Sequence, residues 1–314
     1  MSNLTITFVI LNWRNAAATR ACADSIARQR SLPPHELIVV DNESTPSSAR
    51  ALDGGPWRLV TLDTNRGFTG GMNAGAGAAR GRFIALLNND VRLADDWSER
   101  ALAAMAEPRV AIVGGRDEHT TVPVVSPLGF LALSDVELPR MRVAAVDGGH
   151  LLIRATAWRG LGGFDDDFFA YHEDLDLCAR ALARGWQIVF DPALRVSHAR
   201  GTSSDRVRWR RVFWARRNRT IWLAKHFPHA AWREAILAAA LEYAAEGVRG
   251  APGGPSGADA VIARSAALAG CLWVVTHGRW LAAKRRTNIG RGLYADSYRN
   301  YLAEVYDAMT AVSA

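Results

Sequence analysis

The chain has 314 residues, of which 49% are hydrophobic, and a formal net charge of +7. This length suits one large domain or one domain with an appendage, and the hydrophobic share excludes a chain that is disordered throughout. Three widely separated cysteines, Cys22, Cys178 and Cys271, exclude a disulfide scaffold and a cysteine zinc site, and they indicate a reducing compartment. Residues 4–11 are apolar but too short for a signal peptide, so they predict a buried first strand.

The first 114 residues alternate between strand and helix patterns. Helix patterns cover 16–30, 46–52 and 95–105, and strand patterns cover 4–11, 37–40, 58–62, 83–87 and 110–113. A glycine-rich segment, 65–81, separates the third strand from the fourth. Strands separated by helices predict βαβ units, so the fold class is α/β with a mostly parallel sheet.

The alternation stops at residues 115–142, which contain several prolines and predict a long loop or a small hairpin. Strand-like texture returns over 143–154, and a helix is predicted over 175–184. Segments 187–190 and 194–197 predict the last two strands of the sheet.

The composition changes near residue 204, which divides the chain into an α/β domain, 1–204, and a helical region, 205–314. Residues 205–227 are rich in Arg and Trp, and 230–248 predict an alanine-rich helix. Residues 261–283 are apolar, but their longest uncharged stretch has only 12 residues, too few to cross a bilayer. We therefore expect helices that pack on the core or lie at a membrane interface.

Four polar clusters follow apolar runs, at 39–42, 86–90, 172–174 and 196–198. In an open α/β sheet such residues lie in the crevice at the carboxyl ends of the strands, where ligands bind. One carboxylate there could contact a nucleobase, a second with a histidine could hold a metal, and a third could act as a base. This combination points to sugar transfer from a nucleoside diphosphate.

Each cluster also has a purely structural interpretation. Asp41 could accept a hydrogen bond from a pyrimidine base, or it could serve the turn and helix cap that follow. The glycines after Asn65 could let the backbone approach phosphate, or they could form a tight turn against a helix. No Gly-Lys-Ser/Thr follows them, so this is not a P-loop.

The later clusters leave the same choice. Asp90 is a hard oxygen ligand that suits Mg²⁺ or Mn²⁺, or it is part of a β-turn. Asp174 could act as a base, or it could favour a helix dipole. Six acidic residues lie within 165–176, and such crowding indicates a cation or a proton-transfer role. His198 precedes 201–204, a loop rich in donors for phosphate.

Taken together, these clusters resemble the family 2 glycosyltransferases with the GT-A fold, in particular their bacterial rhamnosyltransferase-like and galactofuranosyltransferase-like branch. The resemblance covers roughly residues 4–227. It rests on the order and spacing of segments 11–13, 39–44, 65–75, 88–90 and 162–174, and of His198.

The resemblance implies a role for each segment. Asp174 is the implied general base, and Glu173 orients it or holds the acceptor. Asp90 and His198 are the implied ligands of a divalent metal, Mg²⁺ or Mn²⁺. The implied acceptor contacts are Gly149, His172 and Glu173. The implied nucleotide-sugar contacts are Asn12, Asp41, Asn42, Asn65, Arg66, Gly67, Asn73, Asn89 and Asp90.

One position departs from the family pattern. Asn88 stands where the family's Asp-x-Asp motif has its first Asp. The branch shares this change, so the implied activity stands, while the loss of one charge weakens the hold on a metal.

The implied reaction is an inverting transfer of a sugar, L-rhamnose first among the candidates, from a dTDP- or UDP-sugar to a hydroxyl of a glycan or a polyprenyl-diphosphate-linked acceptor. The alternatives are galactofuranosyl or other hexosyl transfer, and a non-catalytic module that binds nucleotide sugars or glycans. The implied location is cytoplasmic, at the inner face of the cytoplasmic membrane.

The Arg- and Trp-rich segment has two interpretations. It could dock on anionic headgroups or the carrier diphosphate, or it could cover the α/β domain or form a homodimer contact. The charge lies outside the strand-end clusters, which disfavours nucleic acid as the partner. The residues concerned are Arg208, Trp209, Arg210, Arg211, Trp214, Arg216, Arg217, Arg219 and Trp222.

Overall fold

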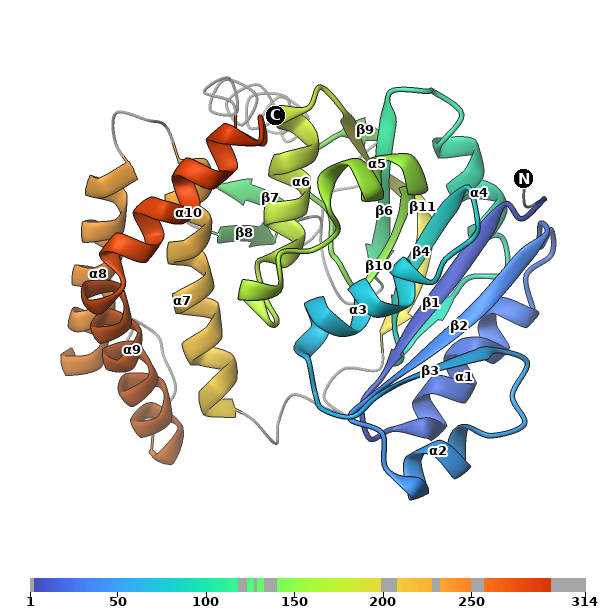
Figure 1. Ribbon diagram of the computed structural model, residues 1–314, viewed down its shortest axis with the longest axis horizontal. Helices are drawn as coiled ribbons and strands as arrows, with labels where there is room; N and C mark the ends of the chain where they lie inside the picture. The colour runs from blue at the N-terminus through green and yellow to red at the C-terminus, as the bar shows by residue number, and fades with distance from the viewer. Residues whose placement is uncertain are drawn as a thin grey trace.

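A computed structural model describes residues 3–117, 123–126, 129–132, 140–198, 208–227, 232–249 and 257–294. A sheet with helices on both faces fills one side of the molecule, and a group of long helices fills the other (Figure 1). Helix α6 lies between the sheet and α7, and α8 and α9 lie beyond α7.

The main sheet is nine-stranded, with the order β3-β2-β1-β4-β10-β6-β11-β5, and β9 pairs with β11 outside this path. Strands β1 to β4 pair in parallel, as do β6 and β11, whereas β10, β5 and β9 run antiparallel to their neighbours. The strands are β1 (Ile6–Asn12), β2 (His35–Asn42), β3 (Arg58–Leu62), β4 (Phe83–Asn88), β5 (Val91–Leu93), β6 (Val110–Asp117), β9 (Met141–Arg142), β10 (His150–Arg154) and β11 (Gln187–His198).

Side chains alternate between the two faces of the sheet, as a pleated strand requires. In β1, Val9 joins the core under α3, α5, α6 and α7, while Phe8 and Ile10 join the core under α1 and α4. Both cores are closed by helices, so the strands are apolar on both faces. These helices are α1 (Ala16–Ala27), α2 (Pro46–Leu52), α3 (Gly67–Gly77), α4 (Trp97–Ala104), α5 (Ala155–Leu161) and α6 (Glu173–Ala183).

The sequence predicted most of the first half correctly, including α2 and β3 to the residue, and it erred in the second half. The two strands expected over 187–197 are one strand, β11, whose pairing with β6 shifts register between Phe190 and Arg195. The strand expected over 143–154 is confined to β10. Helix α5 and the short strand β5 were not predicted.

Residues 115–142 include the hairpin that was one of the two expectations for this segment. Strands β7 (Pro123–Ser126) and β8 (Gly129–Ala132) pair antiparallel as a separate two-stranded sheet. Part of the segment lies outside the described residues, as does the loop 201–204.

The last part of the chain is helical, as expected, with α7 (Arg208–His226), α8 (Trp232–Arg249), α9 (Ala258–Thr276) and α10 (Gly278–Gly290). Ile221, Trp222 and Leu223 of α7 are buried in the core cluster of one sheet face, so this region packs on the α/β part. The expectation that residues 261–283 are too short to cross a membrane was wrong by the criterion of helix length and composition. Asp259–Thr276 within α9 is long and apolar enough to cross one, judged by length and composition alone.

Candidate functional site

The first site residues meet at one edge of the sheet because three parallel strands end there in register. Asn12 pairs with Asp41 across β1 and β2, and Leu11 pairs with Asn88 across β1 and β4. Strand-end residues that are about 30 or more positions apart in the sequence are therefore neighbours, as the strand-end pattern predicted.

Asp41 is held by hydrogen bonds from both sides. Its Oδ1 accepts from Asn12 Nδ2 at 2.8 Å, and its Oδ2 accepts from Ser48 Oγ at 2.7 Å. The side chain has no exposed surface. Ser48 also completes the capping box of α2, so the cap interpretation of Asp41 holds in this structure. Each carboxylate oxygen keeps capacity for a second donor.

The glycine-rich loop is fixed to the same edge by Asn42. Its Nδ2 donates to Gly67 O at 2.9 Å and to Asn65 Oδ1 at 3.1 Å, and its Oδ1 accepts from the Arg66 backbone N at 2.9 Å. Gly67 has φ +73°, and a Cβ there would lie 2.3 Å from Phe169 O, so only glycine fits. Gly67 also begins α3, so the loop leads directly into a helix N-terminus.

Asn73 does not face this loop. Its Nδ2 donates to Phe164 O at 2.9 Å and to Asp166 Oδ1 at 2.7 Å, and its Oδ1 accepts from Phe164 N at 2.9 Å. Its amide is therefore occupied in tying α3 to the 164–166 segment, and we do not place Asn73 among the donor contacts.

The Asn-Asn-Asp segment after β4 brings Asp90 to His198 at the end of β11. Asp90 Oδ1 lies 2.8 Å from His198 Nε2, and this hydrogen bond raises the pKa of the imidazole. Asn89 is directed away from this pair, since its Nδ2 donates to Asn15 O and Thr19 Oγ, both at 3.3 Å. The predicted pairing of Asp90 with His198 is thus present.

Whether a metal fits is decided by the donor set. One carboxylate and one imidazole converge, and Asp117 Oδ2 lies 3.7 Å from His198 Nδ1. Within the described ranges, no group of three or more His, Cys, Asp and Glu side chains could hold a metal by itself. The site therefore fits an ion that takes two protein ligands and completes its shell with diphosphate oxygens and water.

Asp174 lies at the start of α6 beside the Gly148-Gly149 segment. Its Oδ2 accepts from Gly148 N at 3.2 Å and its Oδ1 from Leu175 N at 2.8 Å, and no cation pairs with it among the described residues. Burial and the nearby Asp147 carboxylate raise the pKa of Asp174 to about 7. A carboxylate with such a pKa can take a proton near neutral pH.

Glu173 shares this environment. Burial and the Asp174 charge raise the pKa of Glu173 well above its ordinary value, and Oε2 has no hydrogen-bond partner among the described residues. Burial lowers the pKa of His172 to about 4, so this side chain is neutral near pH 7. Three adjacent residues therefore combine two destabilised carboxylates with an uncharged imidazole.

Asp147 is the site residue that the sequence did not single out. Its Oδ1 accepts from Gly149 N at 2.6 Å, and its charge acts on Asp174, Glu173 and His198 alike. Gly149 O accepts from Asn88 N at 2.8 Å, which joins this segment to the end of β4. An Asp directly before Gly-Gly indicates a turn that could carry a site residue. This signal was overlooked because residues 143–154 resembled one continuous strand.

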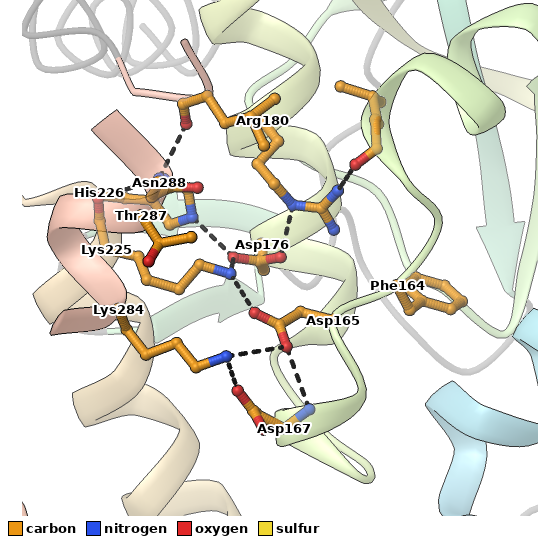
Figure 2. Close-up of polar contacts among 12 residues, drawn as sticks. Phe164, Asp165, Asp167, Asp176, Arg180, Lys225, His226, Lys284, Thr287 and Asn288 are labelled. Atoms are coloured by element: carbon orange, nitrogen blue, oxygen red, sulfur yellow. Dashed lines mark hydrogen bonds and ion pairs between the residues drawn. The ribbon is translucent and has the colours of Figure 1, made fainter. Parts of the chain in front are cut away.

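Three other acids of the 165–176 segment, Asp165, Asp167 and Asp176, are neutralised by cations (Figure 2). Asp176 pairs with Arg180 at 2.7 Å and with Lys225 and His226. Burial alone would raise the pKa of Asp176, but these cations hold it well below its ordinary range. Asp165 and Asp167 pair with Lys225 and Lys284, the only two lysines of the chain.

The acid crowding thus has a structural explanation for three members of the cluster, and a proton-transfer role stays a prediction for the others. Ion pairs to α7 and α10 explain three of the acids without any ligand. Only Glu173 and Asp174 keep the unpaired, buried character that a proton-transfer role requires.

Much of the basic face of α7 is also occupied within the protein. Arg216 pairs with Glu246, and Arg219 pairs with Glu242 at 2.9 Å, both on α8. Arg217 donates to backbone carbonyls, and Trp222 is buried. Arg217 and Trp222 support the interpretation that α7 covers the α/β part, whereas Arg216 and Arg219 join α7 to α8.

Known proteins share parts of this chain. Residues 7–141 match the profile of Glycosyl transferase family 2. A pre-mycofactocin glycosyltransferase of Mycobacterium tuberculosis is 27% identical over 208 residues, which are 63% of this chain and 43% of that protein. The succinoglycan biosynthesis protein ExoO of Rhizobium meliloti is 29% identical over 199 residues, 61% of this chain and 52% of that protein. The chain thus spans about half the length of these relatives.

A shorter match is closer in sequence. The N-acetylglucosaminyl-diphospho-decaprenol L-rhamnosyltransferase of Mycobacterium tuberculosis is 39% identical over 64 residues, which are 20% of this chain and 21% of that protein.

Solved structures share the fold. The mannosyltransferase PcManGT of Pyrobaculum calidifontis, solved with GDP-Man and Mn²⁺, has a TM-score of 0.54 at 15% identity and covers 100% of this chain and 87% of its own. GalNAc-T7, solved with UDP, GalNAc and Mn²⁺, has a TM-score of 0.60 at 13% identity and covers 89% of this chain and 57% of its own. The expected α/β fold of the GT-A type with a C-terminal helical region is confirmed.

Proposed function

We propose, from the match of residues 7–141 to the profile of Glycosyl transferase family 2, that this protein is an inverting glycosyltransferase. It moves a sugar, with L-rhamnose as the first candidate, from a dTDP- or UDP-sugar to a hydroxyl of a glycan or lipid-linked acceptor in the synthesis of a cell-surface polysaccharide. The proposal for the sugar and for a polyprenyl-diphosphate carrier is supported by the name of the 39% identical rhamnosyltransferase.

The observation that carries the proposal is the state of Asp174. It is a buried carboxylate without a cationic partner among the described residues, and its pKa is about 7. It lies beside the Gly148-Gly149 segment, which is hydrogen-bonded to Asn88 at the end of β4. Structural carboxylates of the 165–176 segment are paired with cations instead. An unpaired, buried carboxylate costs stability, and a proton-accepting role accounts for that cost.

The chemistry is a single displacement. Asp174 accepts the proton of the acceptor hydroxyl while the oxygen of that hydroxyl forms a bond to the anomeric carbon. The bond from that carbon to the diphosphate oxygen breaks, and the nucleoside diphosphate leaves with the electron pair from the opposite face of the sugar. A positioned base of this kind contributes about 10²- to 10⁴-fold to the rate. Glu173 holds or orients the acceptor.

Asp90 and His198 would hold the divalent metal, Mg²⁺ or Mn²⁺. When bound, the ion would neutralise charge that develops on the leaving diphosphate. To bind it, the two side chains must exchange the hydrogen bond they share for metal contacts. The exposed Arg66 at the start of α3 would add positive charge on the phosphate side.

The donor's base would lie against Asp41, and its phosphates against the loop of Asn65, Arg66 and Gly67. Asn12 and Asn42 shape these two places through their hydrogen bonds to Asp41 and to the loop. Asp41 favours a pyrimidine base, since a carboxylate accepts from an N3–H group. Gly149 and His172 flank the general base, Asp174, on the acceptor side.

The helical region would bring the enzyme to the inner face of the cytoplasmic membrane, where a lipid-linked acceptor resides. Its exposed apolar residues are the support for a peripheral contact. These residues are Leu237, Leu241 and Val248 of α8, and Val261, Leu268, Leu272 and Val275 of α9.

The decisive experiment is Asp174→Asn, assayed for sugar transfer and for nucleotide binding. We expect transfer to fall by 10²-fold or more, while calorimetric binding of UDP or dTDP with Mn²⁺ stays unchanged. Asp24→Asn, which alters an exposed carboxylate of α1, is the control and should leave both unchanged. Transfer that persists in Asp174→Asn would remove Asp174 as the base.

A non-catalytic nucleotide-sugar or glycan-binding module is the alternative. It predicts tight binding of the donor and no turnover with any acceptor. The choice between rhamnosyl, galactofuranosyl and other hexosyl transfer is made by thermal-shift screening of UDP-, dTDP- and GDP-sugars with Mg²⁺ or Mn²⁺, followed by product analysis.

A further inference from the structure

The five residues that precede Glu173 form a strained turn. Phe169 has φ +63° and ψ −57°, and Tyr171 and His172 have φ +73° and +68°. Ala170 N donates to Phe168 O at 2.7 Å, which closes a γ-turn centred on Phe169. Positive φ is unfavourable for bulky side chains, and this form of γ-turn is rare. The surrounding structure must therefore hold the turn in place.

Helix α7 supplies much of that hold through one side chain. Asn218 is fully buried, and its amide nitrogen lies 2.7 Å from each of three carbonyl oxygens, those of Phe168, Ala170 and Tyr171. An amide nitrogen carries two hydrogens, so the three carbonyls share them. No other described side chain contacts three carbonyls of this turn.

The remaining carbonyls of the turn are bound as well. Arg217 donates to Phe168 O at 3.0 Å and also to Asp167 O. Thr69 N, in the first turn of α3, donates to Phe169 O at 3.1 Å. Every carbonyl from residue 167 to residue 171 thus accepts a hydrogen bond from α7 or from the helix that follows the glycine-rich loop.

This arrangement fixes the direction in which α6 begins. The turn continues directly into Glu173 and Asp174, whereas the hydrogen bonds to the Asp174 carboxylate come from Gly148 and from its own helix. A turn that relaxed towards negative φ would rotate the first residues of α6. The place of the carboxylate then depends on a residue 44 positions later in the chain.

We infer that Asn218 is a positioning residue for the transfer reaction, acting through the 168–172 turn on Asp174. The inference rests on the proposed role of Asp174 as the base. Asn218 has no exposed surface, so it contacts no substrate itself.

The test compares Asn218→Ala with Gln29→Ala in the full chain. Gln29, which follows α1, is a matched control, because it is also a buried amide side chain that donates to two carbonyls, those of Ser25 and Ala94, and it takes no part in the docking of α7 and α10. Hydrogen exchange over residues 165–176 is measured first, and it needs no activity. We expect exchange there to become faster in Asn218→Ala and to stay unchanged in Gln29→Ala.

Kinetics supplies the second readout. A displacement of a catalytic group by about 1 Å can cost on the order of 10²-fold in rate. We expect kcat of Asn218→Ala to fall by up to that factor with the KM for the sugar donor within about threefold, while Gln29→Ala keeps its kcat. The pH at which kcat reaches half its maximum should also fall, because a displaced Asp174 gains contact with water and its pKa returns towards the ordinary value.

Two outcomes would overturn the inference. One is unchanged exchange over 165–176 in Asn218→Ala, and the other is equal loss of kcat in the two variants, which would indicate general destabilisation. If Asn218→Ala does not fold, Arg217→Met removes the hydrogen bonds to Phe168 O and to Asp167 O beside the turn, and it should give the same changes at smaller size. If no nucleotide sugar supports sugar transfer by the wild type, the proposed function fails. The hydrogen exchange over 165–176 still shows whether Asn218 holds the turn.

Discussion

The proposed donor side and the proposed acceptor side of the site are built in different ways. On the donor side, Asn12, Asp41 and Asn42 are fixed by partners on neighbouring strands and on the loop that follows them. On the acceptor side, the segment that carries Asp174 is fixed by Asn218, Lys225 and Lys284, which lie on helices much later in the chain. The donor side is thus a property of the sheet, and the acceptor side is a property of how α7 and α10 dock against it.

The two sides also differ in charge. Around Asp41 the polar groups are neutral amides and hydroxyls that satisfy one carboxylate. Around α6 several carboxylates are buried together, and α7 and α10 neutralise those that do not serve the proposed reaction. A substitution that breaks one of these ion pairs on the acceptor side should therefore cost more stability than a substitution on the donor side.

The largest expected effect is the loss of unfolding free energy caused by Asp176→Ala. This substitution leaves Arg180 buried without its carboxylate and Lys225 with Asp165 alone, and breaking a buried ion pair in this way costs about 3–5 kcal/mol. Asp41→Asn on the donor side keeps its shape and disturbs one hydrogen bond, at about 1 kcal/mol. Chemical denaturation measures both values. Equal losses would contradict the comparison.

The next effect is the pH dependence of the stability difference between Asp174→Asn and the wild type. The folded pKa of Asp174, about 7, lies above the ordinary value of 3.8, so the stability that this group contributes is complete below pH 4 and is lost as pH rises to 7. The loss is at most about 4 kcal/mol, at ~1.4 kcal/mol for each pKa unit. Asp174→Asn should therefore unfold at a higher temperature than the wild type at pH 8, and at a similar temperature at pH 4.

The wild type itself provides a check on this expectation. Its transfer rate should rise with pH through about 7, since the base acts when it is ionised. A rate that is flat between pH 5 and pH 9 would contradict both the role and the raised pKa of Asp174.

A smaller effect is expected for Asp90→Ala on the donor side. Binding of UDP or dTDP in the presence of Mn²⁺ should weaken by about 10- to 100-fold, as is usual when a metal site is disturbed. Titration in metal-free buffer is the control, and there the variant and the wild type should bind alike. Equal affinity in the presence of Mn²⁺ would count against Asp90 as a ligand.

The smallest effect lies outside both sides of the site, on the outer face of α9. Leu272→Glu should weaken binding to anionic vesicles by about tenfold, since burial of a leucine contributes about 1.5–3 kcal/mol. Thr287→Glu, which places the same charge on an exposed position of α10, is the matched control. Transfer to a soluble acceptor should be unchanged in both.

The sequence predicted which strand ends meet on the proposed donor side, because the signals for these strands are local. A strand that ends in Asp41 and one that ends in Asn88 must meet if both are parallel to β1, so periodicity alone brings them together. The pairing of Asp90 with His198 was reached through the resemblance, because nothing local links residues 108 positions apart. The direction of Asn73 was not foreseen, because a helix position does not reveal which loop it meets.

The acceptor side was predicted less well, for a physical reason. The acids of 165–176 look alike in the sequence, and only their distant partners separate the structural ones from the reactive ones. Lys225 is 49 residues from Asp176, and no pattern near Asp176 indicates that the lysine will reach it. Asp147 was missed because apolar residues on both sides gave its segment the texture of a strand.

The placement of the two lysines offers a chemical handle on the docking of α7 and α10. Amine-directed reagents can modify only Lys225, Lys284 and the N-terminal amine in this chain. The Lys284 side chain is 28% exposed and the Lys225 side chain 4%, so a brief treatment should mark Lys284 and spare Lys225. The later appearance of label on Lys225 would then report the separation of α7 from α6 in a protein that carries no engineered substitution.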